Sequence, residues 1–333
     1  MIKKEDMVFD LIKDGKCVSE IKRLTNTNTT NLSMILYNLS QKYNMVSSIN
    51  DLGELRFLID SDIDEMNMAS IDLSYPNLFR AMVISDTHFG NEYARPDYLT
   101  LIYNYCKKND IHIIIHAGDF IDGTSSAFKQ YIKNPTLQVS KAISNYPYDD
   151  NILNLVCFGN HDFSAFENGV NIKDKILCQR YDIRPFALGC GIINIGNDIF
   201  YVKHPIDGFK YENVNNHFIL SGHSHKIGIF CDKVYTNVKI PTLSDLRFNE
   251  NQSLPGALEM KVLLNYSHII GVEFRHLSIL SEGSNLNKCG LFEVGKYDYR
   301  FNYEKSPIND ETYMPEISDD KKCELVKKCG YMK

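Results

Sequence analysis

Five short stretches of the chain combine carboxylate, imidazole and amide side chains at close spacing. In chain order they are Ser85–His88, His116–Asp122, Gly159–Asp162, Lys203–Pro205 and Ser221–His225. Their side chains offer oxygen and nitrogen atoms without sulfur, which is the ligand set of hard to borderline divalent metal ions. Residues i and i+2 of an extended segment point the same way, so Asp86 and His88 can face one ion. His223 and His225 can face an ion for the same reason.

Each of these stretches follows an apolar run that predicts a strand. The first three runs are Leu78–Ser85, Ile111–His116 and Ile152–Phe158. Helical patterns lie between them, at Pro96–Lys108 and at Ser126–Ser144, the second broken near Pro135. Strands that alternate with helices predict a mostly parallel sheet, and such sheets bind ligands at the carboxyl ends of their strands. The second half of the chain predicts strand–turn–strand units at Gly191–Ile195, Asp198–Lys203, Leu258–Leu264 and Ile269–Leu277.

Two ions would suit chemistry at a phosphorus atom. A carboxylate shared between them can hold two ions about 3.5–4 Å apart for an in-line displacement. Gly118, Gly159 and Gly222 would let the backbone turn sharply, so that the next side chain enters the site. The residues therefore indicate metal-assisted hydrolysis of a phosphate ester at one edge of the sheet.

The order of these motifs resembles the calcineurin-like metallophosphoesterase superfamily. Asp-x-His, Gly-Asp-x-x-Asp, Gly-Asn-His-Asp, a lone His and Gly-His-x-His occur in family order, and the resemblance covers roughly residues 78 to 280. Ile115–Asp119 is most similar to the small bacterial phosphodiesterases, and Asp86–Gly90 also looks like the repair nucleases of this superfamily. The resemblance implies a four-layer α/β/β/α sandwich and a phosphoesterase that uses two divalent metal ions, with manganese favoured over Fe, Zn, Ni or Co.

The resemblance also implies a role for each matching residue. The ligands of a first metal would be Asp86, His88 and His225. Those of a second metal would be Asn160, His204 and His223, and Asp119 would bridge the two metals. His161 would be the general acid that protonates the leaving oxygen, and a hydroxide that bridges the metals would be the nucleophile.

The lone histidine departs from the family pattern, because it is usually followed by glycine and here Pro205 follows His204. His217 is the alternative ligand. We favour His204, because the family places this ligand at the end of a strand, and the run Phe200–His204 fits that position.

Three further residues are expected to support the ligands. Asp122 either orients His88 or His161 or caps a helix. His116 is either structural or donates to a ligand carboxylate. Asp162 is expected to anchor its loop through backbone hydrogen bonds. Five cations could each meet the substrate phosphate: Lys203, Lys226, Arg180, Arg184 and Arg247.

Residues 1–60 form a separate unit in the sequence. Helices are predicted at Met7–Ile12, Val18–Leu24 and Asn31–Tyr43, the last capped by Thr30 or Asn31, and strands at Met45–Ile49 and Glu54–Ile59. This order resembles a winged helix-turn-helix module. The helix that would read DNA carries one cation, Lys42, whereas a DNA reader normally shows a basic stripe. We therefore favour packing or homo-oligomerisation over DNA or RNA contact. Residues 61–77 are expected to be a linker, 78–298 the metallophosphoesterase domain, and 299–333 a C-terminal tail with a short helix at 319–328.

Composition narrows the class of protein further. The 333 residues include 42 acidic and 36 basic side chains, for a net charge of −6, so the chain cannot coat nucleic acid by charge alone. No apolar run approaches the roughly 18 residues that span a bilayer, and charged residues interrupt the first 14 positions. The nine cysteines form no Cys-x-x-Cys pair. We therefore expect a cytoplasmic protein with reduced thiols and no membrane partner.

The function expected from the sequence is hydrolysis of phosphodiester bonds, in a nucleic acid or a nucleotide. The alternative activity is that of a phosphomonoesterase or phosphoprotein phosphatase. The alternative of another class is a DNA-binding regulator in which the metal site is structural.

Overall fold

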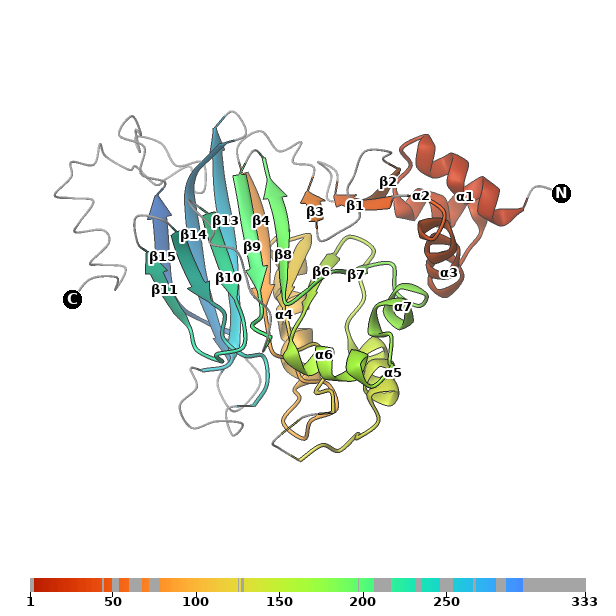
Figure 1. Ribbon diagram of the computed structural model, residues 1–333. Helices are drawn as coiled ribbons and strands as arrows, with labels where there is room; N and C mark the ends of the chain where they lie inside the picture. The colour runs from red at the N-terminus through yellow and green to blue at the C-terminus, as the bar shows by residue number, and fades with distance from the viewer. Residues whose placement is uncertain are drawn as a thin grey trace.

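The computed structural model describes residues 3–43, 45–49, 54–59, 68–71, 78–124, 126, 129–196, 198–206, 217–231, 235–245, 254–265, 268–279 and 286–295. Over these ranges the protein is a mixed α/β structure with a two-stranded and a thirteen-stranded sheet (Figure 1). The predicted tail at 299–333 and its helix lie outside the described residues. No described helix has both the length and the apolar character needed to cross a membrane.

The N-terminal residues form three helices followed by an antiparallel hairpin. These elements are α1 Lys4–Lys13, α2 Val18–Thr25, α3 Thr29–Ser40, β1 Met45–Ile49 and β2 Leu55–Ile59. Their buried core includes Val8, Ile21, Leu32 and Leu36. Helix α3 begins earlier than predicted because Asn28 is its N-cap, and the Asn28 side chain accepts from the Asn31 amide at 2.8 Å. Thr30 and Asn31 therefore lie inside the helix.

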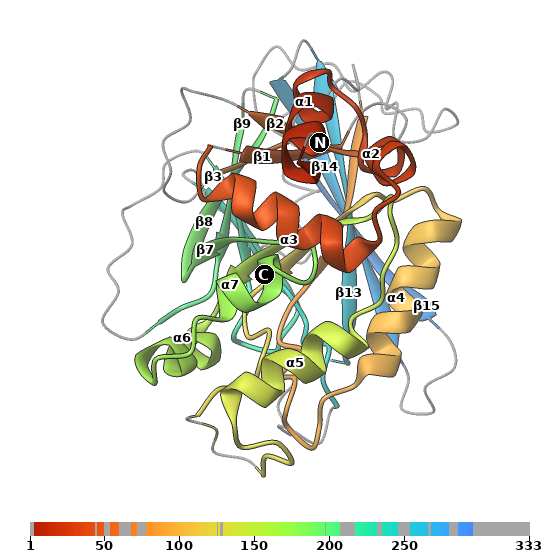
Figure 2. The ribbon, with the colours of Figure 1, turned by 90° about the vertical axis from the view of Figure 1, so that its right-hand side faces the viewer.

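The large sheet contains four parallel strands that carry the first three motifs. They are β4 Leu78–Ile84, β5 Ile113–Ala117, β6 Leu153–Phe158 and β7 Ile183–Leu188. The helices that connect them are α4 Pro96–Lys108, α5 Pro135–Asn145, α6 Asn160–Glu167 and α7 Ile172–Leu177, which lie together on one side of these strands (Figure 2). Strand β4 shows why the strands read as continuous apolar runs. Met82 and Ile84 belong to one buried cluster, and Ala81 and Val83 belong to another.

The remaining strands extend the sheet on both sides. They are β8 Cys190–Ile195, β9 Asp198–Lys203, β10 His217–Ser221, β11 Gly228–Cys231, β12 Tyr235–Lys239, β13 Gly256–Asn265, β14 His268–Ile279 and β15 Leu286–Gly295. Strands β9 and β10 are parallel, and Lys203 pairs with Ser221. Their carboxyl ends, which carry the fourth and fifth motifs, therefore lie side by side.

Two expectations about connecting segments differ in part from the structure. The stretch 61–77, expected to be a linker, contains strand β3 (Met68–Ile71), which pairs in parallel with β8. The helix predicted at Ser126–Ser144 begins only at Pro135, after the cap Asn134. Proline lacks an amide hydrogen and has a fixed φ, so it suits the first turn of a helix and not its interior.

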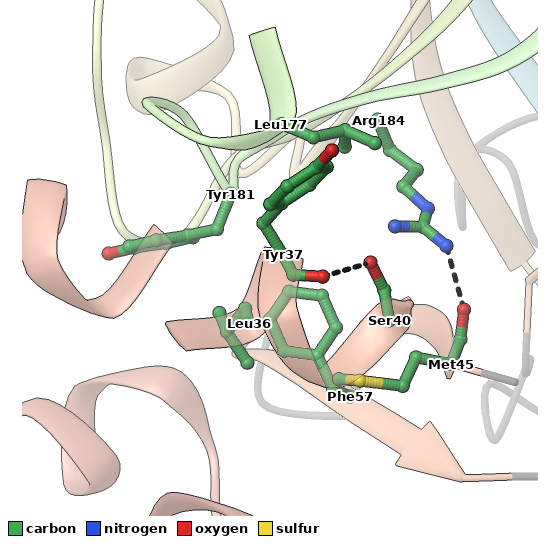
Figure 3. Close-up of a pocket in the computed structure, with 8 residues that line it drawn as sticks. All are labelled: Leu36, Tyr37, Ser40, Met45, Phe57, Leu177, Tyr181 and Arg184. Carbon is green, nitrogen blue, oxygen red and sulfur yellow. Dashed lines mark hydrogen bonds between the residues drawn. The ribbon is translucent and has the colours of Figure 1, made fainter. Parts of the chain in front are cut away.

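The N-terminal module packs directly on the large domain. Lys22 of α2 forms an ion pair with Asp150 at 2.9 Å, and Ser33 Oγ of α3 accepts from the Tyr181 amide at 3.1 Å. Arg184 of β7 donates to the Met45 carbonyl at 2.8 Å, across a small pocket that both parts line (Figure 3). Arg184 therefore joins the two parts of the protein. The structure does not show it in a position to hold substrate phosphate.

Candidate metal centre

The turns that follow the strands hold an unusual concentration of backbone strain. Five of the seven predicted ligands have φ in the left-handed region: Asp86 (56°), His88 (45°), Asp119 (55°), His223 (74°) and His225 (52°). Among the other described non-glycine residues, only Asn26 and Asp110 share this conformation. Such a residue costs of order 1–3 kcal/mol and persists where the surroundings determine its position. The extended i, i+2 geometry proposed from the sequence is therefore replaced by left-handed turns.

The first group of ligand atoms comes from Asp86, His88 and His225. His225 Nε2 lies 2.9 Å from Asp86 Oδ1 and 3.4 Å from His88 Nε2. His88 Nε2 lies 3.8 Å from the same Asp86 oxygen. All three residues are buried. The geometry therefore brings together the three side chains that the resemblance assigns to a first metal.

The second group comes from Asn160, His204 and His223. Asn160 Oδ1 lies 3.1 Å from His204 Nε2 and 3.0 Å from His223 Nδ1. The Asn160 side chain projects from the first residue of α6, directly after the turn at Gly159. His223 is exposed, whereas His204 is fully buried. The second group thus opens toward solvent on the side of His223.

Asp119 lies between the two groups. Its Oδ2 atom is 3.7 Å from His88 Nε2 in the first group and 3.1 Å from His204 Nε2 in the second. Its other oxygen, Oδ1, accepts from the backbone amide of His161 at 3.0 Å. One carboxylate oxygen therefore reaches both groups, which is the geometry required of a bridging ligand.

The donor atoms fit divalent cations. Ligands bound at about 2.0–2.2 Å around one ion stand about 3.0–3.5 Å apart from each other. Five contacts among these atoms, at 2.9–3.4 Å, match this spacing, and the 3.8 Å between His88 Nε2 and Asp86 Oδ1 is slightly longer. A third set, His88, Asp122 and His161, is also close enough to hold an ion. It shares His88 with the first group, however, and His161 Nδ1 already donates to the Asp122 carbonyl.

The electrostatics of the cluster also favour a cation. Burial alone would lower the pKa of His88, but the carboxylates of Asp122 and Asp86 outweigh it and raise this pKa to about 10. Burial opposes protonation of His204 as well, yet Asp119 raises the pKa of His204 to about 9. Buried carboxylates thus create a strongly negative potential at both groups, and a divalent ion would neutralise it.

His204 occupies its position through close backbone contacts. Its Nδ1 atom donates to the Ala117 carbonyl at 2.7 Å, which directs Nε2 toward Asn160 and Asp119. A Cβ atom on Gly118 would lie 2.1 Å from the His204 ring, and Gly118 has a φ of +98°. Gly159 needs no left-handed φ, and its hydrogen side chain is required because a Cβ would lie 2.3 Å from Asp119 Oδ1. The side chain of His217 lies outside the described residues.

We expect His204→Ala to lower the metal content by about one ion per chain, because it removes a ligand of the second group. His217→Ala is the matched control and should leave the metal content unchanged. Metal analysis of the purified variants by mass spectrometry measures both. Loss of metal from the His217 variant alone would reverse the assignment.

The supporting residues take positions that the sequence left open. Asp122 Oδ1 lies 3.3 Å from His88 Nδ1 and 3.7 Å from His161 Nδ1, so Asp122 faces both histidines, and among the described residues the next helix, α5, is capped by Asn134 instead. Asp162 accepts from the amides of Gly159, Phe120 and Ile121 at 2.8–3.0 Å, which ties the β5 and β6 turns together.

His116 contacts a hydroxyl group and no ligand carboxylate. Its Nε2 atom lies 3.0 Å from Thr87 Oγ1. In the sequence, Thr87 stands between the predicted ligands Asp86 and His88. Burial lowers the pKa of His116 to about 3, so the ring is neutral. Arg180, considered as a substrate cation, is buried in an ion pair with Asp182 at 2.6 Å. Arg247 lies outside the described residues, and Lys226 is exposed.

Several side chains near the site carried no motif in the sequence. Asn91 Nδ2 donates to Asp122 Oδ1 at 3.0 Å, and Gln130 Nε2 donates to Asp122 Oδ2 at 2.7 Å. Gln138 of α5 accepts from the amide of Gly123, the residue that follows Asp122. These amides are separated from Asp122 by 8 to 31 residues, and only the folded chain brings them together.

Comparison with known proteins agrees with this geometry. Residues 79–227 match the model of the family described as calcineurin-like phosphoesterase, and the matched segment includes all seven predicted ligands. Over these residues the chain is therefore similar to calcineurin-like phosphoesterases. No curated protein matches the chain.

Several solved structures are similar to the chain at low identity. The phosphoesterase YfcE from E. coli is 12% identical, with a TM-score of 0.37, over 58% of this chain and 98% of that one. Vacuolar protein sorting 29 from Cryptosporidium parvum is 12% identical, with a TM-score of 0.38, over 66% and 100%. The nuclease MPE from Pseudomonas putida is 16% identical, with a TM-score of 0.30, over 57% and 86%.

Proposed function

We propose that the protein is a two-metal phosphoesterase that hydrolyses phosphodiester bonds of a nucleic acid or a nucleotide. The observation that carries this proposal is the position of Asp119, whose Oδ2 atom lies within 3.7 Å of His88 Nε2 and 3.1 Å of His204 Nε2. Two divalent ions, for which manganese is our first choice, would neutralise the phosphoryl oxygens and lower the pKa of a bound water.

The remaining steps belong to the protein's own side chains. Asp119 Oδ1 accepts from the His161 amide, so the residue that joins the two groups also fixes the start of α6. His161 is less buried than the ligands, with 16% of its side chain exposed against 1% for His88. Its Nδ1 atom donates to the Asp122 carbonyl at 2.8 Å. In the imidazolium form of the ring, Nε2 would then be the nitrogen that gives its proton to the leaving oxygen, while Nδ1 keeps its bond to the carbonyl.

Turnover of two chromogenic substrates tests the type of ester. The manganese-loaded protein should hydrolyse bis-p-nitrophenyl phosphate with a higher kcat/KM than p-nitrophenyl phosphate. A preference for the monoester would identify a phosphomonoesterase or phosphoprotein phosphatase. A protein that binds both metals and hydrolyses neither compound, but retards DNA in a gel as wild type and as His161→Asn, would be a regulator.

For the N-terminal module we propose a winged-helix-like unit of residues 1–60 that serves packing and homo-oligomerisation. In support, Ser33 of α3 bonds to Tyr181, and Tyr37 and Ser40 line the pocket shared with the phosphoesterase domain (Figure 3). That side of α3 is therefore occupied by the protein itself. We further propose that the phosphoesterase domain covers residues 78–298 as a four-layer sandwich, and that the protein acts in the cytoplasm.

A further inference from the structure

One peptide bond connects His161 to a buried glutamine on another helix. The carbonyl of Asp122 accepts from His161 Nδ1 at 2.8 Å. The amide of Gly123, which belongs to the same peptide bond, donates to Gln138 Oε1 at 2.8 Å. Hydrogen bonds that share a peptide unit polarise one another and fix its orientation. The position of the His161 ring therefore depends on Gln138 through a single planar group.

Gln138 is bonded as a clamp on Gly123. Its Nε2 atom donates to the Gly123 carbonyl at 3.0 Å and to the Ile132 carbonyl at 2.8 Å, while Oε1 accepts from the Gly123 amide. The residue is fully buried. An unpaired buried amide would cost about 1–3 kcal/mol, and these three bonds avoid that cost. Gln138 thus holds both backbone groups of one residue.

The space around this clamp leaves little freedom. Gly123 has a φ of +64°, and a Cβ atom there would lie 2.0 Å from the His161 carbonyl and 2.2 Å from Ser164 Oγ. A Cβ on Gly90 would lie 2.5 Å from Gln138 Cγ. Gln138 is therefore wedged between the turn that follows His88 and the turn that supports His161.

The bond to a carbonyl also decides which ring nitrogen can exchange a proton with the substrate. A carbonyl oxygen can only accept, so Nδ1 of His161 keeps its proton, and Nε2 is the nitrogen that carries the second proton of the imidazolium form and gives it to the leaving oxygen. We propose that Gln138 is a positioning residue for His161, which sets the ring's orientation and tautomer through the Asp122–Gly123 peptide. This inference rests on the proposed function for the role of His161, but the contact itself is independent of it.

The kinetic test uses Gln138→Leu and Gln138→Glu in the full-length manganese-loaded protein. Leucine removes all three bonds, and glutamate keeps the acceptor but loses both donors. We expect kcat on thymidylyl-thymidine, which has a poor alkoxide leaving group, to fall by about 10–100-fold, as for a displaced catalytic group. On bis-p-nitrophenyl phosphate the fall should be under about 3-fold, since p-nitrophenolate needs little protonation. Gln179→Glu, at an exposed position in the turn that follows α7, is the matched control.

The same changes in a His161→Asn background separate positioning from folding. If Gln138 acts through His161, Gln138→Leu should lower kcat no further in that background. An equal loss on both substrates, or a further loss without His161, would show that Gln138 only stabilises the fold, and the proposal would fall.

A spectroscopic test does not depend on turnover. In the zinc-loaded protein with ¹⁵N-labelled histidine, we expect the His161 ring to be protonated at Nδ1, with its signals identified by their loss in His161→Asn. Gln138→Leu should shift this ring toward the other tautomer or an exchanging mixture. An Nε2–H ring in the wild type, or no change in the variant, would contradict the proposal. If the protein gives the expected spectra but hydrolyses no phosphate ester, the proposed function is rejected and the positioning of the His161 ring by Gln138 is retained.

Discussion

Replacing His161 with asparagine is expected to lower turnover of a dinucleotide by about 10²–10⁴-fold, the usual contribution of general acid catalysis. The ring is expected to supply the proton for a poor alkoxide leaving group from Nε2, since its Nδ1 atom donates to the Asp122 carbonyl. On bis-p-nitrophenyl phosphate the loss should be smaller, because p-nitrophenolate leaves with little need of a proton. Steady-state kinetics on the two substrates measure the difference.

Metal content is the control for this variant. His161→Asn should retain both ions, since the described ligand atoms of the two groups come from other residues. An equal loss on both substrates would indicate positioning or charge in place of acid catalysis. Loss of the ions would show that His161 is a ligand.

Replacing Asp119 with asparagine should have a still larger effect. Asp119 is the residue whose carboxylate oxygen reaches both groups, at 3.7 Å from His88 and 3.1 Å from His204. Asparagine removes its negative charge and leaves one oxygen and one amide nitrogen. Changes in residues that only support a ligand cost 10–100-fold in metal affinity, so loss of this ligand should weaken binding by at least about 100-fold. Both ions and hydrolysis of both substrates should be lost together.

Asp110→Asn is a matched control for this change, because Asp110 also has a left-handed backbone but its side chain is 87% exposed. It should keep the wild-type metal content and turnover. If Asp119→Asn kept two ions per chain, Asp119 would not be a bridging ligand.

The predicted ligands converge because each motif directly follows a strand. The carboxyl ends of parallel neighbours such as β4, β5 and β6 must meet at one edge, whatever the details of the turns. The local geometry was not predictable from spacing. Asp86 and His88 lie in left-handed turns and not in an extended segment, and they are bonded to residues that follow β5 and β10. The amide of His223, for example, donates to Asp86 Oδ2 at 3.1 Å.

The supporting network was beyond the reach of the sequence. Gln138 lies 15 residues from Gly123, and on a helix its side chain is indistinguishable from a solvated polar residue until the fold buries it. Strand β3 was missed for a similar reason. Its four residues, Met68–Ile71, are too few to establish a period, and they pair with β8, more than 100 residues later in the chain.

The most direct test of the two-metal account is a metal titration of the dialysed protein. After exhaustive dialysis against EDTA, hydrolysis of bis-p-nitrophenyl phosphate should be abolished. Added Mn²⁺ should restore it fully, with two ions bound per chain by metal analysis. Because all seven predicted ligands supply oxygen or nitrogen atoms, restoration should not require a thiol reductant. Hydrolysis that persists while metal analysis shows an empty site would contradict the account.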